Sequence, residues 1–174
     1  NPSSYTGENR PVTNVNWDEA KVFIEKLKKI TRKEFRLPSE SEWEYAARGG
    51  IYSQGYEYCG SDDLKQVGWY RDNSERETKP VGLLLPNELG LYDMSGNVVE
   101  WCEDDYHDNY KEAPDDGSAW IDGATAADKA AFRVIRGGGY FSGAGGCRAA
   151  YRRRYSPGVR YGTFGFRLVF SLQS

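Results

Sequence analysis

The sequence RLPSESEWEYAARGG, residues 36–50, carries the strongest local structural information in this chain. Ser39 is followed three residues later by Glu42, the spacing of a capping box that opens a helix. Trp43 and the alanines after it favour helix, and two consecutive glycines at 49–50 are typical of a helix end. The stretch therefore predicts a helix over residues 40–48, entered from a short extended segment.

Towards the N-terminus, a second helix is predicted over residues 17–32. Asn16 and Glu19 form another capping-box pair, and apolar residues recur at helical spacing from Ala20 to Ile30. Helical periodicity fades after residue 50. We expect strands at 133–136 and 166–170, where β-forming residues gather, to close a small sheet, and some helix near 124–131.

Length and composition predict one globular domain. The chain has 174 residues, 39% of them hydrophobic and 14% aromatic, enough to form a core. The sequence contains no run of 18 apolar residues, so no transmembrane helix is predicted. A single histidine excludes sites built from three imidazoles, and three widely spaced cysteines exclude a disulfide framework or a CxxC knuckle. Since the chain starts at Asn1 and not at a methionine, we expect a processed or trimmed fragment.

Charge is divided unevenly along the chain. Residues 1–128 hold 26 acidic residues against 8 Lys and 6 Arg, a net charge of −12, whereas residues 129–174 carry +9. Two interpretations remain open: the two parts pair their charges inside one domain, or they form surfaces with different roles. A nucleic-acid-binding tail is disfavoured, because the arginines are dispersed among Gly, Tyr and Phe.

Four ordered blocks resemble the formylglycine-generating enzyme (sulfatase-modifying factor) family. They are residues 11–17, 36–50 and 87–101, together with the closing pair 133–138 and 165–168. The resemblance implies an α+β, C-type lectin-like domain over residues 1–174, with two helices, a small antiparallel sheet and much irregular structure. Because the family usually has strands before the first block, it also implies that the N-terminal part of the domain is missing.

The family's catalytic residues do not carry over completely. The resemblance implies two cysteines, five residues apart, that bind copper and activate oxygen; Ser142 stands at the first position and Cys147 at the second. A hydroxyl is neither a soft ligand nor a redox thiol. The sulfoxide-forming branch needs three histidines, and the calcium triplets of sugar-binding lectins are absent. We therefore expect no enzyme activity, no catalytic residues and no catalytic cofactor.

Several other residues have a structural interpretation that outweighs a functional one. Asp104, Asp105, His107 and Asp108 could ligate a metal, but a solvated acidic turn is favoured. Asn97 and Glu100 resemble positions where the family holds a structural calcium, which leaves calcium open as a minor alternative. Buried positions are expected for the cysteines and for four tryptophans: Cys59, Cys102, Cys147, Trp17, Trp43, Trp69 and Trp101.

Residues 137–168, GGGYFSGAGGCRAAYRRRYSPGVRYGTFGFRL, have the composition of a protein-binding surface. They hold nine of the 20 glycines, four Tyr, three Phe and six Arg, and no Asp, Glu or Lys. Tyr and Arg supply contact area, while Gly and Ser supply adaptability. We interpret this segment as a variable ligand-binding region.

The spacing in this segment also resembles the variable region of proteins diversified by retroelements, in which Asn codons of a template are altered at their adenines. Such codons never yield Lys, Glu, Gln, Met or Trp, and none of these occurs at the positions left for variation. The predicted ligand-binding residues are Phe141, Ser142, Gly143, Gly145, Gly146, Tyr151, Arg153, Arg154, Tyr155, Ser156, Val159, Tyr161, Gly162 and Thr163. Gly138, Arg148 and Phe166 are assigned to the supporting frame.

The resulting functional prediction is a non-enzymatic, receptor- or adhesin-type bacterial protein, at the cell surface or secreted. Its partner would be a protein ligand and not a nucleic acid. The alternative is a catalytically inactive relative of the formylglycine-generating oxidoreductases, in which residues 137–168 are only a Gly- and Arg-rich structural segment.

Overall fold

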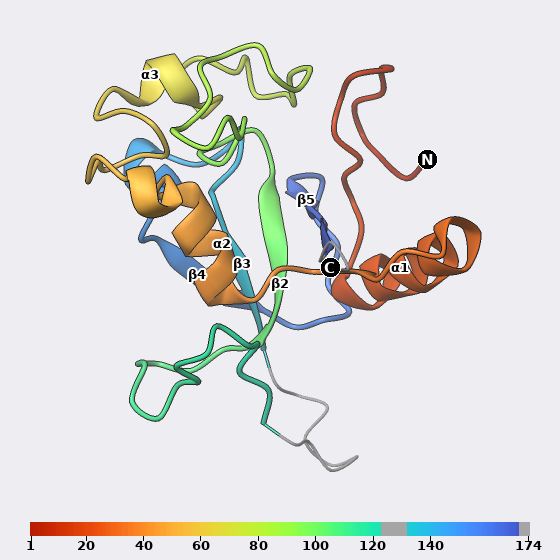
Figure 1. Ribbon diagram of the computed structural model, residues 1–174. Helices are drawn as coiled ribbons and strands as arrows, with labels where there is room; N and C mark the ends of the chain where they lie inside the picture. The colour runs from red at the N-terminus through yellow and green to blue at the C-terminus, as the bar shows by residue number, and fades with distance from the viewer. Residues whose placement is uncertain (123–131, 171–174) are drawn as a thin grey trace.

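The computed structural model describes residues 1–122 and 132–170 (Figure 1). Two helices begin at the predicted caps: α1 at Trp17–Thr31 and α2 at Glu40–Ala47, each with a complete capping box. A short helix α3 at Leu64–Val67 and two 3₁₀ turns, η1 at Gly50–Tyr52 and η2 at Ala144–Cys147, were not predicted. The helix expected near 124–131 lies outside the described residues.

The central sheet has four strands in the order β4-β3-β2-β5. They are β2 at Val99–Asp105, β3 at Arg133–Arg136, β4 at Arg152–Tyr155 and β5 at Phe164–Gly165. β3 pairs antiparallel with both β2 and β4, whereas β5 runs parallel to β2. In Figure 1, α1 and α2 lie on opposite sides of this sheet.

The expectation that 166–170 would join 133–136 in one sheet is wrong. β6 at Val169–Phe170 instead pairs with β1 at Phe35–Arg36 in a separate two-stranded sheet. Where one strand was expected at 166–170, residues 164–165 pair with β2, and after a turn only residues 169–170 form a strand, beside β1. The central sheet is therefore mixed and not purely antiparallel.

The core is arranged in clusters around the central sheet. One contains Trp43, Met94 and Val134, and a second contains Ile24, Trp101 and Phe164. All three cysteines are buried, as predicted. Of the tryptophans, Trp43 and Trp101 are fully buried, while Trp17 and Trp69 are only partly so.

The charge asymmetry is resolved largely by pairing inside the domain. Six of the eight arginines after residue 129 contact carboxylates from the N-terminal two thirds of the chain. The pairs are Arg133–Asp105, Arg136–Glu40, Arg136–Glu44, Arg152–Glu40, Arg154–Asp108, Arg160–Glu19 and Arg167–Glu100. Arg136 is completely buried between Glu40 and Glu44, so this pairing is part of the core.

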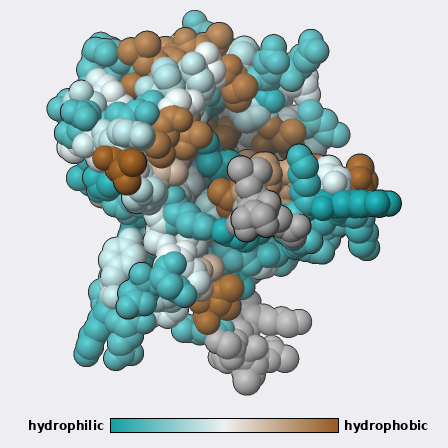
Figure 2. Space-filling model, in the orientation of Figure 1, coloured by the Kyte–Doolittle hydropathy of each residue, from teal (hydrophilic) through white to brown (hydrophobic). Residues whose placement is uncertain are grey.

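The outer surface is mostly polar, with apolar side chains exposed among the loops at the end of the molecule that carries α3 (Figure 2). Leu83 and Leu85 are among these exposed residues. Within the described ranges, no helix has the length and apolar character needed to span a bilayer.

Candidate ligand-binding hollow

A hollow of about 390 Å³ lies where β3, β4 and the start of β5 meet the turn at η2. We use "the hollow" for this cavity and its lining. Ten of the fourteen predicted positions line it: Phe141, Ser142, Gly143, Gly145, Gly146, Tyr151, Arg153, Tyr155, Tyr161 and Thr163. The structure therefore brings most of the predicted set together from three separate parts of the segment.

Two consecutive glycines after β3 direct the chain towards the hollow. Gly137 and Gly138 have φ of +87° and +68°, where side chains other than glycine are strained. A Cβ on Gly138 would lie 2.5 Å from the carbonyl oxygen of Gly146 and 2.8 Å from the Cys147 sulfur. The close approach of these backbones places η2 directly beside the end of β3.

The loop from Gly139 to Ser142 is fixed by local hydrogen bonds. The Gly139 amide donates to Ser142 Oγ at 3.0 Å, and the Ser142 amide donates to the Gly139 carbonyl at 2.7 Å. The Arg71 amide donates to the Ser142 carbonyl at 3.0 Å, which anchors the loop to the α3 region. Ser142 therefore serves as a turn residue at the edge of the hollow.

Cys147 is fully buried, and burial raises the pKa of its thiol to about 12. A thiol must ionise to act as a nucleophile or a soft metal ligand. Cys147 is neutral at physiological pH, and the position where the family resemblance implies the first thiol holds Ser142. Among residues 1–122 and 132–170, no group of three or more His, Cys, Asp or Glu side chains is placed to hold a metal.

Aromatic rings form the base of the hollow near β5. Phe164 is buried, and the rings of Tyr155 and Tyr161 meet it edge-on at centroid distances of 4.8 and 5.0 Å. Tyr161 and Phe141 are each about half exposed, at 50% and 51%. Rigid aromatic faces are therefore presented to solvent above a packed core, an arrangement suited to protein contacts.

Side chains on β4 alternate between the two faces of the sheet. Arg153 and Tyr155 face the hollow, whereas Arg152 and Arg154 face Tyr106 on the opposite side. Arg154 therefore lies outside the hollow, contrary to the prediction. The sequence could not show which arginines face the hollow, because three identical residues in a row give no sign of the two-residue alternation of a strand.

Three further predicted positions do not line the hollow: Ser156, Val159 and Gly162. Val159 packs against the core cluster of Trp101 and Phe164 and so belongs to the support. Conversely, Arg148 was assigned to the frame but is exposed, with its Nε donating to the Gly145 carbonyl at 3.0 Å. The lining also includes frame residues that the prediction omitted, chiefly Val99, Ile135 and Phe164.

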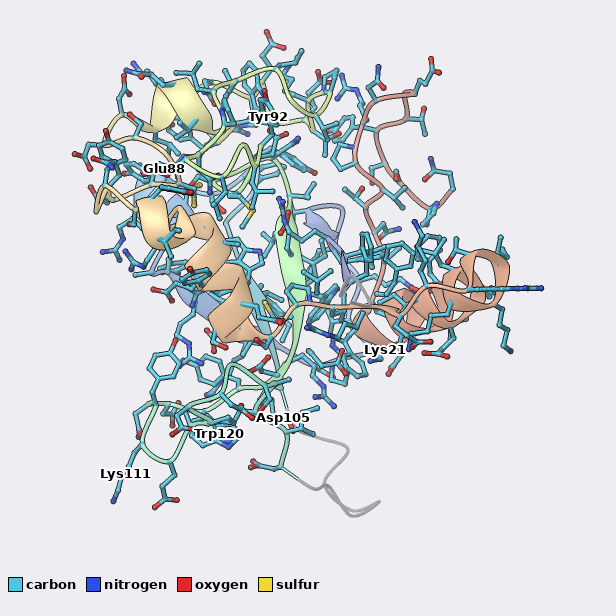
Figure 3. All side chains as sticks on the ribbon, viewed as in Figure 1. Lys21, Glu88, Tyr92, Asp105, Lys111 and Trp120 are labelled. Atoms are coloured by element: carbon cyan, nitrogen blue, oxygen red, sulfur yellow. The ribbon has the colours of Figure 1, made fainter. Side chains whose placement is uncertain are left out.

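The expectation of a solvated acidic turn is wrong for Asp104 and Asp105, which are buried at the end of β2. The Asp104 carboxylate accepts from the amides of Glu40 and Trp120, and burial raises its pKa to about 6. His107 stacks on Trp120 with ring centroids 3.5 Å apart. Figure 3 shows Trp120 and Lys111 in the loop that follows β2, with Asp105 where that loop begins.

The two positions associated with calcium take part in internal hydrogen bonds. Asn97 Oδ1 accepts from the Lys79 amide, and its Nδ2 donates to the Lys79 carbonyl, both at 3.0 Å. Glu100 accepts from Trp43 and bidentately from Arg167. These contacts occupy the side-chain oxygens that a cation would need, and calcium binding here stays an untested prediction.

Comparison with known proteins defines the class. The family model for the sulfatase-modifying factor enzyme 1-like domain matches residues 1–172, so the chain belongs to this family. The chaperone protein LppX of Paenibacillus barcinonensis is 31% identical over 98% of this chain and 73% of its own length. The formylglycine-generating enzyme of Streptomyces coelicolor is 35% identical, over 95% and 54% respectively.

Both an enzyme and an inactive protein are therefore among the relatives. The inactive C-alpha-formylglycine-generating enzyme 2 of Bos taurus is 32% identical over 71% of this chain and 43% of its length. The chain spans about half the length of the two formylglycine-generating relatives, so their activity is not transferred to it.

Two solved structures share the fold over 97% of this chain. Treponema denticola variable protein 1 matches with a TM-score of 0.84 and 32% identity, covering 76% of that protein. PvdO from Pseudomonas aeruginosa matches with a TM-score of 0.83 and 33% identity, covering 64%. The α+β, lectin-like fold of the formylglycine-generating type, and the likeness to variable proteins, are thereby confirmed.

Proposed function

We propose that the hollow binds protein ligands and that this chain is a non-enzymatic recognition protein whose hollow is diversified by a retroelement. The observation that carries the proposal is spatial. Ten positions picked out by a template pattern, spread over residues 141–163, converge on a single cavity. Their likeness to the variable region of such proteins is matched by the overall similarity to Treponema denticola variable protein 1.

The division between support and lining favours the same function. Phe164 and Cys147 are buried beneath the hollow, whereas Phe141 and Tyr161 extend into solvent. Exposed side chains on a rigid support can be exchanged with little effect on folding. A recognition surface that varies needs this separation, and a merely structural Gly- and Arg-rich segment does not.

Nucleic acid is not the proposed ligand. Six of the eight C-terminal arginines have carboxylate partners, which leaves little free positive charge for phosphate contacts. A receptor or adhesin role further implies a place at the cell surface or outside the cell. Digestion of intact source cells by an added protease should degrade the protein, and complete protection would argue against that location.

The enzymatic alternative is tested directly. The purified protein is incubated with copper, oxygen and a sulfatase-type cysteine peptide, and the peptide is followed by mass spectrometry. We expect no conversion to formylglycine, because Ser142 replaces a thiolate and the Cys147 thiol is neutral. Conversion that disappears in Cys147→Ala would contradict the non-enzymatic proposal.

Diversification is tested by sequencing the codons for residues 137–168 in many independent isolates of the source population. We expect substitutions to concentrate at the predicted positions, above all at the ten that line the hollow, and a near-copy of the segment to lie beside a reverse transcriptase gene. Substitutions spread evenly through the domain, with no such copy, would leave only the inactive-relative interpretation.

A further inference from the structure

Arg153 is the arginine of β4 whose charge is not neutralised by a neighbouring acid. Arg152 on the opposite face contacts Glu40, and Arg154 contacts Asp108. Alternation along the strand turns Arg153 into the hollow instead, and in residues 1–122 and 132–170 no carboxylate lies within ion-pair distance of it. The hollow therefore contains an unneutralised guanidinium.

Tyr151 holds this guanidinium in place. Arg153 Nε donates to the Tyr151 hydroxyl at 2.7 Å, and the guanidinium carbon lies 5.4 Å from the centre of the Tyr151 ring. With Nε occupied, the edge formed by the two terminal nitrogens remains for a bidentate partner. The Tyr151 hydroxyl accepts from Nε, so its own proton is available for donation. The pair thus presents mainly donors, from the guanidinium edge and the Tyr151 hydroxyl.

The surroundings reinforce this preference for an anion. The lining contains no Asp or Glu, and Arg136, which also lines the hollow, is already neutralised by Glu40 and Glu44. Arg148 lies outside the lining, with its Nε donating to the Gly145 carbonyl, and the Arg71 guanidinium beside Gly143 is paired with Asp72 at 3.6 Å. The positive charge of the hollow therefore comes from Arg153. Clefts lined by one sign of charge concentrate ligands of the opposite sign.

We propose that Arg153, held by Tyr151, binds the carboxylate of an acidic side chain of the protein ligand, while an apolar neighbour of that side chain packs on Phe141 and Tyr161. This inference rests on the proposed function and specifies the chemistry that this version of the hollow selects: an Asp or Glu next to an aromatic or aliphatic residue.

A displayed peptide library supplies the probe. The immobilised protein is used to select from a phage library of random disulfide-closed heptapeptides, and the same library is selected in parallel on the Tyr161→Ala variant. We expect Asp and Glu to be enriched at least threefold among peptides selected by the wild type. An apolar residue should recur beside the acid.

The best wild-type peptide is then synthesised with its acid intact and with that acid changed to its amide. Binding is measured by fluorescence polarisation on the wild type, Arg153→Gln and the matched rim control Arg148→Gln. We expect Arg153→Gln to weaken binding of the acidic peptide about tenfold or more, as loss of a charged hydrogen-bonded pair does. The amide peptide should bind the wild type and Arg153→Gln equally weakly. Arg148→Gln should change binding by no more than about threefold, as expected for a rim charge.

The outcomes separate this inference from the proposed function. The selected peptides could lack acids, and their binding could be weakened by Tyr161→Ala but not by Arg153→Gln. That result would overturn the carboxylate anchor and leave the hollow as a binding site. Failure to select any peptide, or peptides indifferent to every hollow substitution, would count against both. Thermal melting of each variant, with Arg153→Lys as a second probe of the charge, shows that lost binding is not lost folding.

Discussion

Gly138 is the residue on which the geometry of the hollow most depends. Its φ is positive, and a Cβ at this position would lie 2.5 Å from the Gly146 carbonyl oxygen, so there is no room for a side chain. We expect Gly138→Ala to lower the free energy of unfolding by about 2 kcal/mol or more. Urea denaturation followed by circular dichroism measures this change.

Gly145 provides the matched control for that substitution. It lies in the same loop, and a Cβ there would have no neighbour within 4 Å. Gly145→Ala should alter the free energy of unfolding by less than about 0.5 kcal/mol. Equal effects of the two substitutions would mean that the contact between η2 and the end of β3 does not support the hollow.

Asp104 should make the stability of the protein depend on pH. Burial raises its pKa from an ordinary 3.8 to about 6, so the unfolded chain loses this proton at lower pH than the folded one. The stabilising contribution is complete below about pH 4 and is lost as pH rises through 6. Relative to Asp104→Asn, the free energy of unfolding of the wild type should fall by about 2 to 3 kcal/mol between pH 4 and pH 7.

Chemical denaturation of both proteins at the two pH values tests this expectation. Other titrating groups are common to both proteins and cancel in the difference. A wild-type advantage that instead grows between pH 4 and pH 7 would show that the amide donors of Glu40 and Trp120 outweigh burial at Asp104.

At the scale of elements, β4 separates structural from exchangeable arginines. Arg152 is largely buried and donates to the Glu40 carboxylate and the His107 carbonyl, whereas Arg153 is exposed. Arg152→Ala should lower the free energy of unfolding by about 2 kcal/mol or more, because it leaves the buried Glu40 carboxylate less well paired. Arg153→Ala should cost less than about 0.5 kcal/mol. Thermal denaturation compares the two variants. Equal losses of stability would contradict the assignment of Arg152 and Arg153 to opposite faces of β4.

The helices were predictable because their start signals are local. Asn16 with Glu19, and Ser39 with Glu42, form both hydrogen bonds of a capping box in the structure. Each predicted helix ends one residue beyond the observed one. Such signals need no knowledge of the rest of the chain.

The sheet was less predictable because its decisive pairings are not local. β5 and β6 have two residues each, too few to show alternation, and they join different sheets. β2 continues through Asp104 and Asp105, which are buried by partners distant in sequence. Acidic residues at a strand end give no sign of burial until those partners are known.

At the scale of the whole molecule, the hollow was predictable as a set of residues but not as a shape. Ten of the fourteen positions chosen from the template spacing line the hollow, and their role in ligand binding stays a prediction. The spacing could not distinguish Val159, which packs against the core, or Arg154, which belongs to the opposite face. Both errors arise from tertiary contacts that spacing does not encode.

Replacing several lining residues together tests whether the support is independent of its surface. One variant carries four joint substitutions to Ser, at Phe141, Tyr151, Arg153 and Tyr161. Its free energy of unfolding should stay within about 1 kcal/mol of the wild-type value. Tyr155 and Val159 changed to Ser, as a matched pair, should cost more because both pack on the core. Differential scanning calorimetry compares the two, and equal losses would place the whole set in the core.

The order β4-β3-β2-β5 has a consequence for how this protein can evolve. The segment that follows β3 supplies both outer strands of the sheet, one beside β3 and the other beside β2. Each stretch between these strands must span a fixed distance, and a one-residue slip would exchange the two faces of β4. Insertions and deletions are therefore penalised where substitutions are tolerated. New specificities at this site therefore require substitutions that keep the length of the segment constant. Error-prone copying of a template, the mechanism proposed above, would produce changes of this kind.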